Sequence, residues 1–316
     1  MIFYVPFFLL SCFGLYYSGE LVVGALMRVA KFLGWKEFVV AFIVMSFASS
    51  LPNLLVGIFS IFHRIPILSF GDVVGGNVVD LTLAIAISAL IAKGLPTDSR
   101  TVQSSSIFTL IIAVLPLFLI LDGILGRIDG LILISIFIAY NIWLFSKKER
   151  FIKDCEDEDF SRIREFKPFL RDMGYISLGL LVILLSAEGI VLSSKFFAYA
   201  WHWDLALIGI LIVGLGNALP EIYFSISLAR KCETWMILGN LMGCVIVPAT
   251  LVLGLVALLA PIKIPDFSPF VIARFFLIIS ALFFFFFVKS DKKISKTEAL
   301  VLLFIYIAFV VSEIVF

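Results

Sequence analysis

The sequence predicts an all-α membrane protein of ten transmembrane helices, arranged as two inverted five-helix repeats with broken helices at the membrane midplane. Three observations support this fold class. The 316 residues are 62% hydrophobic and 15% charged, whereas soluble proteins average about 45–50% apolar residues. Long apolar stretches recur along the whole chain. The chain also repeats itself at a fixed offset.

Ten apolar stretches are long enough to cross a hydrocarbon core, which requires about 20 residues per helix. The first stretch contains Glu20 and lacks both a basic start and a small-residue cleavage site. It is therefore predicted to be a membrane span and not a signal peptide. The ten predicted spans cover roughly residues 2–30, 37–62, 68–92, 104–122, 128–146, 173–198, 204–229, 234–260, 268–288 and 297–315.

The internal repeat has an offset of 168 residues, the interval from Pro52 to Pro220, and it needs no gap. The segment Phe47-Ala-Ser-Ser-Leu-Pro-Asn53 returns as Leu215-Gly-Asn-Ala-Leu-Pro-Glu221. Each half has five predicted spans, an odd number, so the second half is expected to lie inverted relative to the first. Inverted repeats with Gly- or Pro-interrupted helices in matching places are typical of transporters whose substrate site lies between the halves.

The positions of Lys and Arg predict the orientation. Of the 24 basic residues, 19 fall on one side of the predicted topology, and the positive-inside bias makes this the cytoplasmic side. The protein is thus expected in the cell membrane, as a multi-pass protein with both termini outside. Residues 147–172 carry eight basic and eight acidic side chains. They are predicted to form a cytoplasmic linker, favoured over a regulatory cation sensor, between a first repeat at 1–146 and a second at 173–316.

Intramembrane carboxylates are the candidates for chemistry, because an ionisable side chain at bilayer depth costs at least ~2.5–3.5 kcal/mol and needs a reason. Four residues qualify: Glu20, Asp80, Glu188 and Glu221. Residues three or four apart share one helical face. Oxygen-bearing side chains are therefore predicted to lie beside Asp80 and Glu221. The predicted cation-binding residues are Asp80, Glu221, Asn53, Asn217, Ser49, Ser50 and Asn77.

Oxygen-only ligand sets suit hard cations such as Ca²⁺, Na⁺ or Mg²⁺. Asp80 and Glu221 have no Lys or Arg in the same spans, so a bound cation or proton is their expected partner. Glu20 and Glu188 are expected to make structural hydrogen bonds or to face an aqueous vestibule. No Ser/His/Asp, Cys/His or phosphate-loop arrangement is present, so neither an enzyme nor a cofactor is predicted. The net charge of +1 says nothing about partners, and no nucleic-acid partner is expected.

The duplicated motifs resemble the two alpha-repeats of the calcium/cation antiporter superfamily, and most closely its sodium/calcium exchangers. In that family, a Gly-Thr-Ser-Leu-Pro-Glu pattern in each repeat supplies paired glutamates that bind Ca²⁺ and Na⁺ in alternation, and Gly-Ser-Asn segments complete the site. The corresponding segments here are Ala48-Ser-Ser-Leu-Pro-Asn53 with Gly71-Asp-Val-Val-Gly-Gly-Asn-Val-Val-Asp80, and Gly216-Asn-Ala-Leu-Pro-Glu221 with Gly239-Asn-Leu-Met-Gly-Cys244.

The chain departs from this pattern at several site positions. Asn53 stands in place of the first family glutamate, while Glu221 keeps the second. Asp80 stands where the exchangers often have asparagine, and its repeat mate Pro248 where they often have aspartate. Only two acids, Glu221 and Asp80, are then expected at the site. Two carboxylates are neutralised by one divalent or two monovalent ions, which predicts exchange without net charge movement.

The resemblance implies a secondary-active antiporter that exchanges Ca²⁺, or a similar hard divalent cation, for Na⁺ or H⁺ by alternating access. The loss of one glutamate leaves a second hypothesis open, a monovalent cation or proton exchanger of the same fold. A non-transporting relative is the third. The expected partners are the transported ions and the lipid bilayer, and the chain is compatible with a monomer.

Overall fold

The structure is a computed structural model that describes residues 3–32, 45–146, 166–230, 234–264, 268–291 and 293–315. Within these ranges, nine helical stretches have the length and apolar composition of a membrane span, and the shorter apolar helix Phe47–Phe62 stands at the remaining predicted position. The predicted fold class is thereby confirmed. The predicted linker falls largely in 147–165, outside the described residues, and its place and role stay a prediction.

The first half contains five helical stretches. Their ends match the predicted spans closely, except at the start of the second span, predicted at 37: the described helix begins at Met45, and residues 33–44 lie outside the described residues. Pro66 precedes the third of them, and Ser99 caps the fourth by accepting a hydrogen bond from the backbone N–H of Val102. The elements are α1 (Tyr4–Phe32), α3 (Met45–Phe62), α4 (Ile67–Val79) continuing through η2 (Asp80–Ala84) into α5 (Ile85–Ala92), α6 (Arg100–Leu119) with η3 (Ile120–Asp122), and α7 (Arg127–Ser146).

The second half repeats this order. Its first helix, α8, is longer than the predicted span at both ends, because hydropathy detects only the apolar middle of a helix that continues beyond it. The elements are α8 (Phe166–Trp201), α9 (Leu205–Ile208) with η4 (Gly209–Val213) and α10 (Gly214–Arg230), α11 (Thr234–Val247) with η5 (Pro248–Val252) and α12 (Leu253–Leu259), η6 (Ser268–Phe270) with α13 (Val271–Ser290), and α14 (Lys296–Val315).

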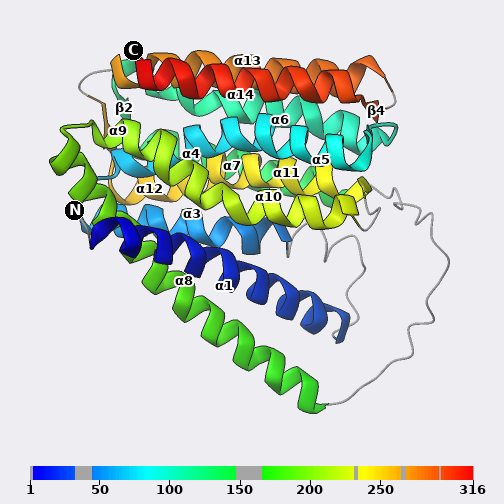
Figure 1. Cartoon of the computed structure of the whole chain (residues 1–316), viewed down its shortest axis with the longest axis horizontal. Helices are drawn as coiled ribbons and strands as arrows, with labels where there is room; N and C mark the ends of the chain where they lie inside the picture. The colour runs from blue at the N-terminus through cyan, green and yellow to red at the C-terminus, as the bar shows by residue number, and fades with distance from the viewer. Residues whose placement is uncertain are drawn as a thin grey trace.

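Two short antiparallel strand pairs tie the halves together at opposite ends of the molecule. β1 (Leu95–Pro96) pairs with β4 (Lys293–Ile294), and β2 (Ile124–Leu125) pairs with β3 (Ile262–Lys263). In each pair one strand comes from each half, and Figure 1 shows β2 and β4 at opposite ends of the helices. The strands satisfy backbone hydrogen-bonding groups where helices end, a need that is strict next to hydrocarbon.

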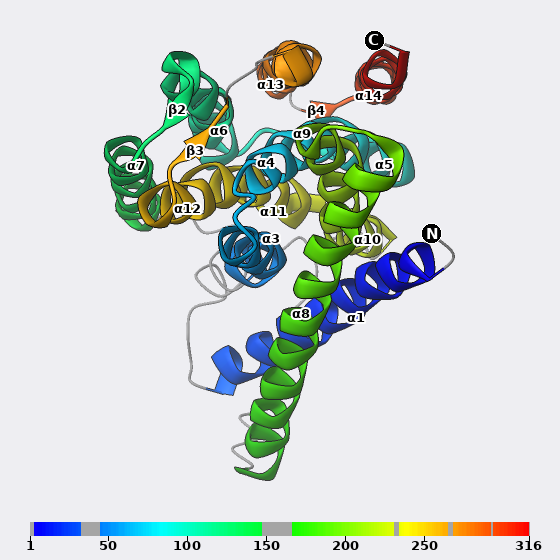
Figure 2. The same ribbon diagram turned by 90° about the vertical axis from the view of Figure 1, so that its left-hand side faces the viewer.

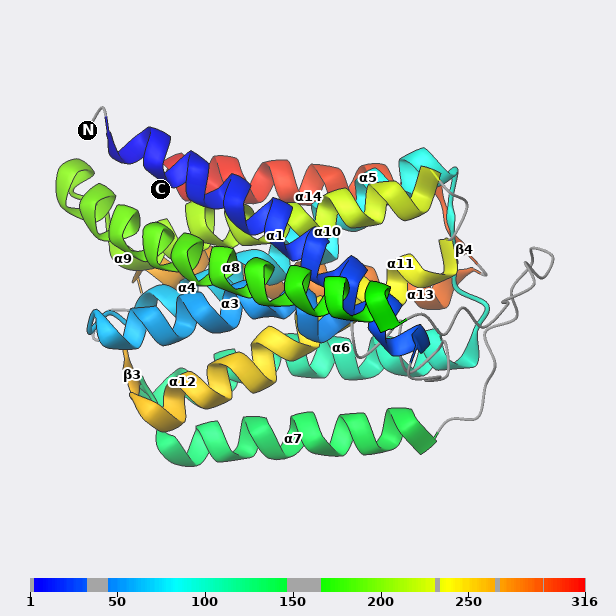
Figure 3. The same cartoon turned by 90° about the horizontal axis from the view of Figure 1, so that it is seen from below.

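The helices form an inner group and an outer group. The span that joins α11 to α12 is 83% buried, whereas that of α14 is 28% buried. Figure 2, a view along the helices, shows α4 and α11 in the centre, with α13 and α14 on one side and α1 with α8 on the other. α1 and α8 run in opposite directions, and both termini lie at the same end (Figures 1 and 3). This is the arrangement that inverted repeats require.

The predicted helix interruptions take a specific form. α3 and α10 continue through Pro52 and Pro220 without a break. Three π-helical turns interrupt the described helices: η2 beginning at Asp80, η4 beginning at Gly209 and η5 beginning at Pro248. Asp80 and Pro248 are repeat mates. Because η2 begins at Asp80 without a proline, a proline is not required for such a turn. Single π-turns are frequent at functional sites.

Candidate functional site

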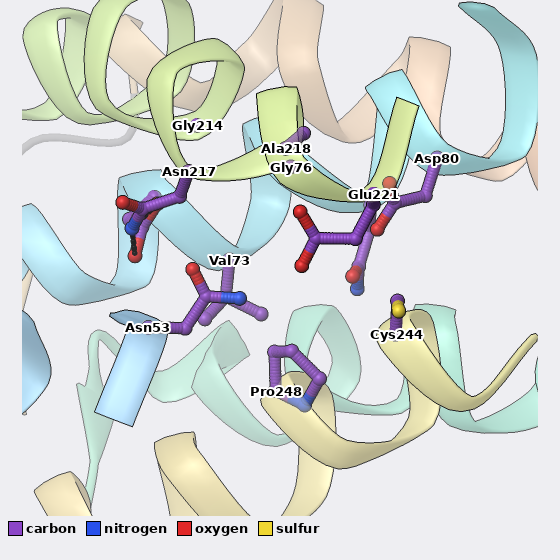
Figure 4. Close-up of a pocket in the computed structure, with 12 residues that line it drawn as sticks. Asn53, Val73, Gly76, Asp80, Gly214, Asn217, Ala218, Glu221, Cys244 and Pro248 are labelled. Carbon is purple, nitrogen blue, oxygen red and sulfur yellow. Dashed lines mark hydrogen bonds between the residues drawn. The ribbon is translucent and has the colours of Figure 1, made fainter. Parts of the chain in front are cut away.

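A pocket lies between two helices of each half, at the level of the π-turns. The empty space between its lining atoms, including the part open to solvent, is about 220 Å³. α3 and α11 contribute one wall, and α4 and α10 the other. Figure 4 shows Asn217 at one end, Asp80 at the other, and Glu221 and Asn53 between them. The lining residues are Asn53, Asp72, Val73, Gly76, Asn77, Asp80, Gly214, Asn217, Ala218, Glu221, Cys244 and Pro248.

Three of these residues are acids buried from solvent: Asp72, Asp80 and Glu221, with 1%, 5% and 3% of their surface exposed. Oδ1 of Asp80 and Oε2 of Glu221 are buried and have no hydrogen-bonding partner. A buried ionised carboxylate without a partner is energetically expensive. None of the twelve lining residues, all within the described ranges, is basic. A bound cation or proton is therefore the partner expected for these oxygens.

Asp72 is a pocket residue that the sequence analysis missed. The side-chain Nδ2 of Asn217 donates hydrogen bonds to both of its carboxylate oxygens, each at 2.9 Å. Asn217 is itself buried, and its Oδ1 has no partner. Two features of the sequence agree with a pocket position for Asp72, although neither shows that its helical face borders the pocket. It stands four residues before Gly76 and eight before Asp80, on one helical face, and its repeat mate is the polar Asn240.

Five of the seven predicted cation-binding residues line the pocket, namely Asn53, Asn77, Asp80, Asn217 and Glu221. The other two, Ser49 and Ser50, are not among the lining residues. The hydroxyl of Ser49 lies 3.2 Å from Sγ of Cys244, which does line the pocket. Ser49 therefore contacts the site through Cys244.

Glu20 and Glu188 lie away from the pocket. Glu20 is exposed on α1. Glu188 on α8 pairs with His63 at the end of α3, with 2.7 Å between Oε1 and Nε2. The structural hydrogen bond expected for Glu188 is thus present, and neither residue is placed to bind a cation in the pocket.

Glycine contacts fix the packing of α4 against α9 and α10. A Cβ on Gly71 would lie 2.7 Å from the carbonyl oxygen of Ala206 on α9, and one on Gly214 of α10 would lie 2.7 Å from the backbone nitrogen of Gly76. Real Cβ atoms do not approach other atoms so closely, so only glycine allows the two backbones to meet here. Close helix approach through small residues is the usual way that membrane helices pack. It brings Asp72 within hydrogen-bonding distance of Asn217.

Comparison with known proteins places this site in a family. The family model described as sodium/calcium exchanger protein matches the chain twice, over residues 3–146 and 172–315. The chain belongs to the sodium/calcium exchanger family. The two matches correspond to the two halves that carry α3 with α4 and α10 with α11, so each family repeat contributes two helices to the pocket. Membership also means that the chain is a membrane cation exchanger by family and not an enzyme.

Relatives of this exchanger cover most of its length. The sodium/calcium exchanger MaX1 of Methanosarcina acetivorans is 25% identical and aligns with 96% of this chain and 97% of its own. The inner membrane protein YrbG of Escherichia coli is 24% identical, over 78% and 76% of the two chains. A solved structure of the sodium-calcium exchanger NCX_Mj, soaked with 100 mM Na⁺ and 10 mM Sr²⁺, has a TM-score of 0.70 and 25% identity over 98% of both chains.

Proposed function

We propose that this chain is a secondary-active antiporter that exchanges Ca²⁺, or a similar hard divalent cation, for Na⁺ or H⁺ through the pocket between α3, α4, α10 and α11. The observation that carries the proposal is the set of three buried carboxylates without a basic residue in the lining. Carboxylate and amide oxygens are the ligands that Ca²⁺ and Na⁺ use in proteins. Names of relatives such as sodium/calcium exchanger MaX1 agree with this substrate class.

The proposed roles of the lining residues follow from their atoms. Asp80 and Glu221 supply the charged ligands through the oxygens that have no other partner. Asn53, Asn77 and Asn217 supply neutral amide oxygens. Ser49 and Ser50 are proposed to position this set without lining the pocket themselves, Ser49 through its contact with Cys244.

Alternating access is proposed to involve α1, which covers α10 beside the pocket. A Cβ on Gly216 would lie 3.1 Å from Sγ of Cys12 on α1. The rings of Tyr16 on α1 and Tyr223 on α10 meet edge to face at 5.0 Å. α1 also packs along α8 (Figures 2 and 3). A displacement of this helix pair relative to α10 would open the region next to Asn217.

Flux measurements in sealed proteoliposomes test the proposal. We expect Ca²⁺ uptake that is driven by an opposing Na⁺ or H⁺ gradient and is absent from protein-free vesicles. Each gradient is varied singly, with K⁺ as the control ion.

One observation favours a second candidate, a monovalent cation or proton exchanger: Asn53 offers no charge where the family pattern has glutamate. Gradient-driven Na⁺/H⁺ flux that Ca²⁺ neither joins nor inhibits would select it. No flux of any ion would indicate a non-transporting relative.

A further inference from the structure

The charge of the pocket lies entirely on one of its two walls. Each acid has an uncharged repeat mate at the offset of 168 residues: Asn240 for Asp72, Pro248 for Asp80, and Asn53 for Glu221. The acids belong to α4, η2 and α10, and their mates to α11, η5 and α3. The duplication therefore built two equivalent walls, one of which carries three carboxylates and the other none.

Asp72 extends this charged wall beyond the pair formed by Asp80 and Glu221. Eight residues of helix separate the Cα atoms of Asp72 and Asp80 by about 12 Å. A single cation with ligand distances of about 2.5 Å does not reach ligands at both ends unless the side chains converge strongly. Figure 4 agrees, because Asn217, the partner of Asp72, lies at the end of the pocket opposite Asp80, and Glu221 lies between them.

The Asp72 end of the pocket has the properties of a ligand position. Asn217 is 2% exposed, it has committed its amide nitrogen to Asp72, and its Oδ1 is left without a partner. A carboxylate with two oxygens accepts about four hydrogen bonds or ligand contacts, and Asn217 supplies one contact to each oxygen. Asp72 thus retains capacity for a cation beside an amide oxygen that also needs one.

We propose that Asp72 binds a transported cation directly, at the end of the pocket opposite Asp80, and supplies there the carboxylate that the opposite wall lacks at Asn53. This inference rests on the proposed exchange function and adds a third acidic ligand to the pocket. Asn53 lies in the same pocket as Asp72, so a carboxylate moved to position 53 enters the same site from the opposite wall. The role of Asp72 is therefore one of charge, which can be relocated, and not only one of holding Asn217.

Relocation of the carboxylate is the test. We compare wild type, Asp72→Asn, Asn53→Glu and the double variant Asp72→Asn/Asn53→Glu. Asp98→Asn serves as the control, because Asp98 is an exposed acid outside the pocket. Apparent Ca²⁺ affinity is measured from proteoliposome uptake and, independently, from the Ca²⁺-dependent shift in melting temperature of detergent-solubilised protein. Melting without Ca²⁺ shows whether each variant is folded.

We expect Asp72→Asn to lower the apparent Ca²⁺ affinity at least tenfold, and the double variant to recover to within threefold of wild type. A folded Asp72→Asn with unchanged affinity overturns the inference. So does a folded double variant that binds no better than Asp72→Asn, because Asp72 would then act only where it stands. Wild-type protein that neither binds nor transports Ca²⁺ overturns the proposed divalent exchange instead. The apparent Na⁺ affinity of the same variants is then measured. Asp72→Asn must again lower this affinity, and the double variant must again restore it.

Discussion

Glu221 and Asp80 each combine full burial with an oxygen that has no partner. The atoms concerned are Oδ1 of Asp80 in η2 and Oε2 of Glu221 in α10. Replacing a charged ligand by its amide keeps the volume and removes the charge. Interactions of polar groups with a charged partner are worth about 1.5–3 kcal/mol, which corresponds to roughly a tenfold or larger change in affinity.

We therefore expect Glu221→Gln and Asp80→Asn each to lower apparent Ca²⁺ affinity by about tenfold or more. Glu20→Gln is the matched control, because Glu20 is an intramembrane acid that is exposed on α1, and its affinity should stay near that of wild type. Uptake at a series of Ca²⁺ concentrations gives the measurement. If Glu20→Gln abolished binding while both pocket variants bound normally, the wrong carboxylates would have been assigned.

The charged wall depends on how α4 packs against the continuous helical stretch made of η4 and α10. Gly75 is the closest contact in this pair, because a Cβ there would overlap the backbone carbonyl of Ile210. Ile210 lies within the π-turn η4, so its position is fixed by helix geometry and not by a flexible side chain. The neighbouring residues Asp72 and Gly76 then take their places opposite Asn217 and Gly214.

Gly75→Ala should consequently separate α4 from η4 and destabilise the protein. Overpacking costs about 1–3 kcal/mol, and rigid backbone on the opposite side favours the upper end. The apparent melting temperature in detergent should fall by about 5 °C or more, and Ca²⁺ affinity should fall with it. Gly19→Ala is the control, because a Cβ on Gly19 meets no atom within 4 Å. An equal change in the melting temperature of both variants would show that the close approach at Gly75 contributes no more to stability than the open position of Gly19.

Element boundaries could be predicted from the sequence wherever apolar length alone sets them. The span predicted at 128–146 is α7 at Arg127–Ser146, and the one at 297–315 is α14 at Lys296–Val315. The form of the interruptions could not be predicted. A proline inside an apolar helix suggests a break, but whether a turn becomes π-helical depends on how neighbouring helices accept the shifted backbone groups, which only the packed structure shows.

The site could be predicted for the residues that the duplicated motif displays, and not for Asp72. Asn53, Asn217 and Glu221 belong to the Leu-Pro segments that repeat, so the offset identifies them. The repeat mate of Asp72 is an asparagine, and its relevance depends on which face of α4 meets α10. The glycine contacts of Gly71 and Gly75 decide that face. Sequence spacing shows that Asp72, Gly76 and Asp80 share a face, but not that this face borders the pocket.

At the scale of the whole molecule, the last turn of α7 and the first turn of α8 lie at the end of the helices opposite the N- and C-termini (Figure 3). The eight basic residues between 147 and 172 are expected to hold that end in the cytoplasm. The orientation relative to the cell is the prediction that remains to be measured.

A variant that keeps Cys155 and replaces Cys12, Cys232 and Cys244 measures it. Cys155 should react with a membrane-impermeant thiol reagent in inverted vesicles and remain unlabelled in intact cells. A cysteine introduced after the C-terminal residue should give the reverse pattern and serves as the control. Labelling of Cys155 from outside intact cells would reverse the proposed topology and place both termini in the cytoplasm.

The third carboxylate also changes the charge moved per transport cycle. Two acids predicted exchange without net charge, but Asp72, Asp80 and Glu221 together line the pocket. Three monovalent ions neutralise three carboxylates, whereas one divalent ion leaves one negative charge. Exchange of three monovalent ions for one divalent ion therefore moves one net charge across the membrane. For one charge, about 60 mV corresponds to a tenfold change in an equilibrium ratio.

A valinomycin-clamped potential of about 60 mV should therefore shift the final Ca²⁺ ratio of wild type about tenfold. Asp72→Asn restores a pocket with two carboxylates, and its residual exchange at high Ca²⁺ should no longer respond to the potential. A wild-type ratio that is indifferent to the potential would mean that the charge of Asp72 is not exposed to the transported ions.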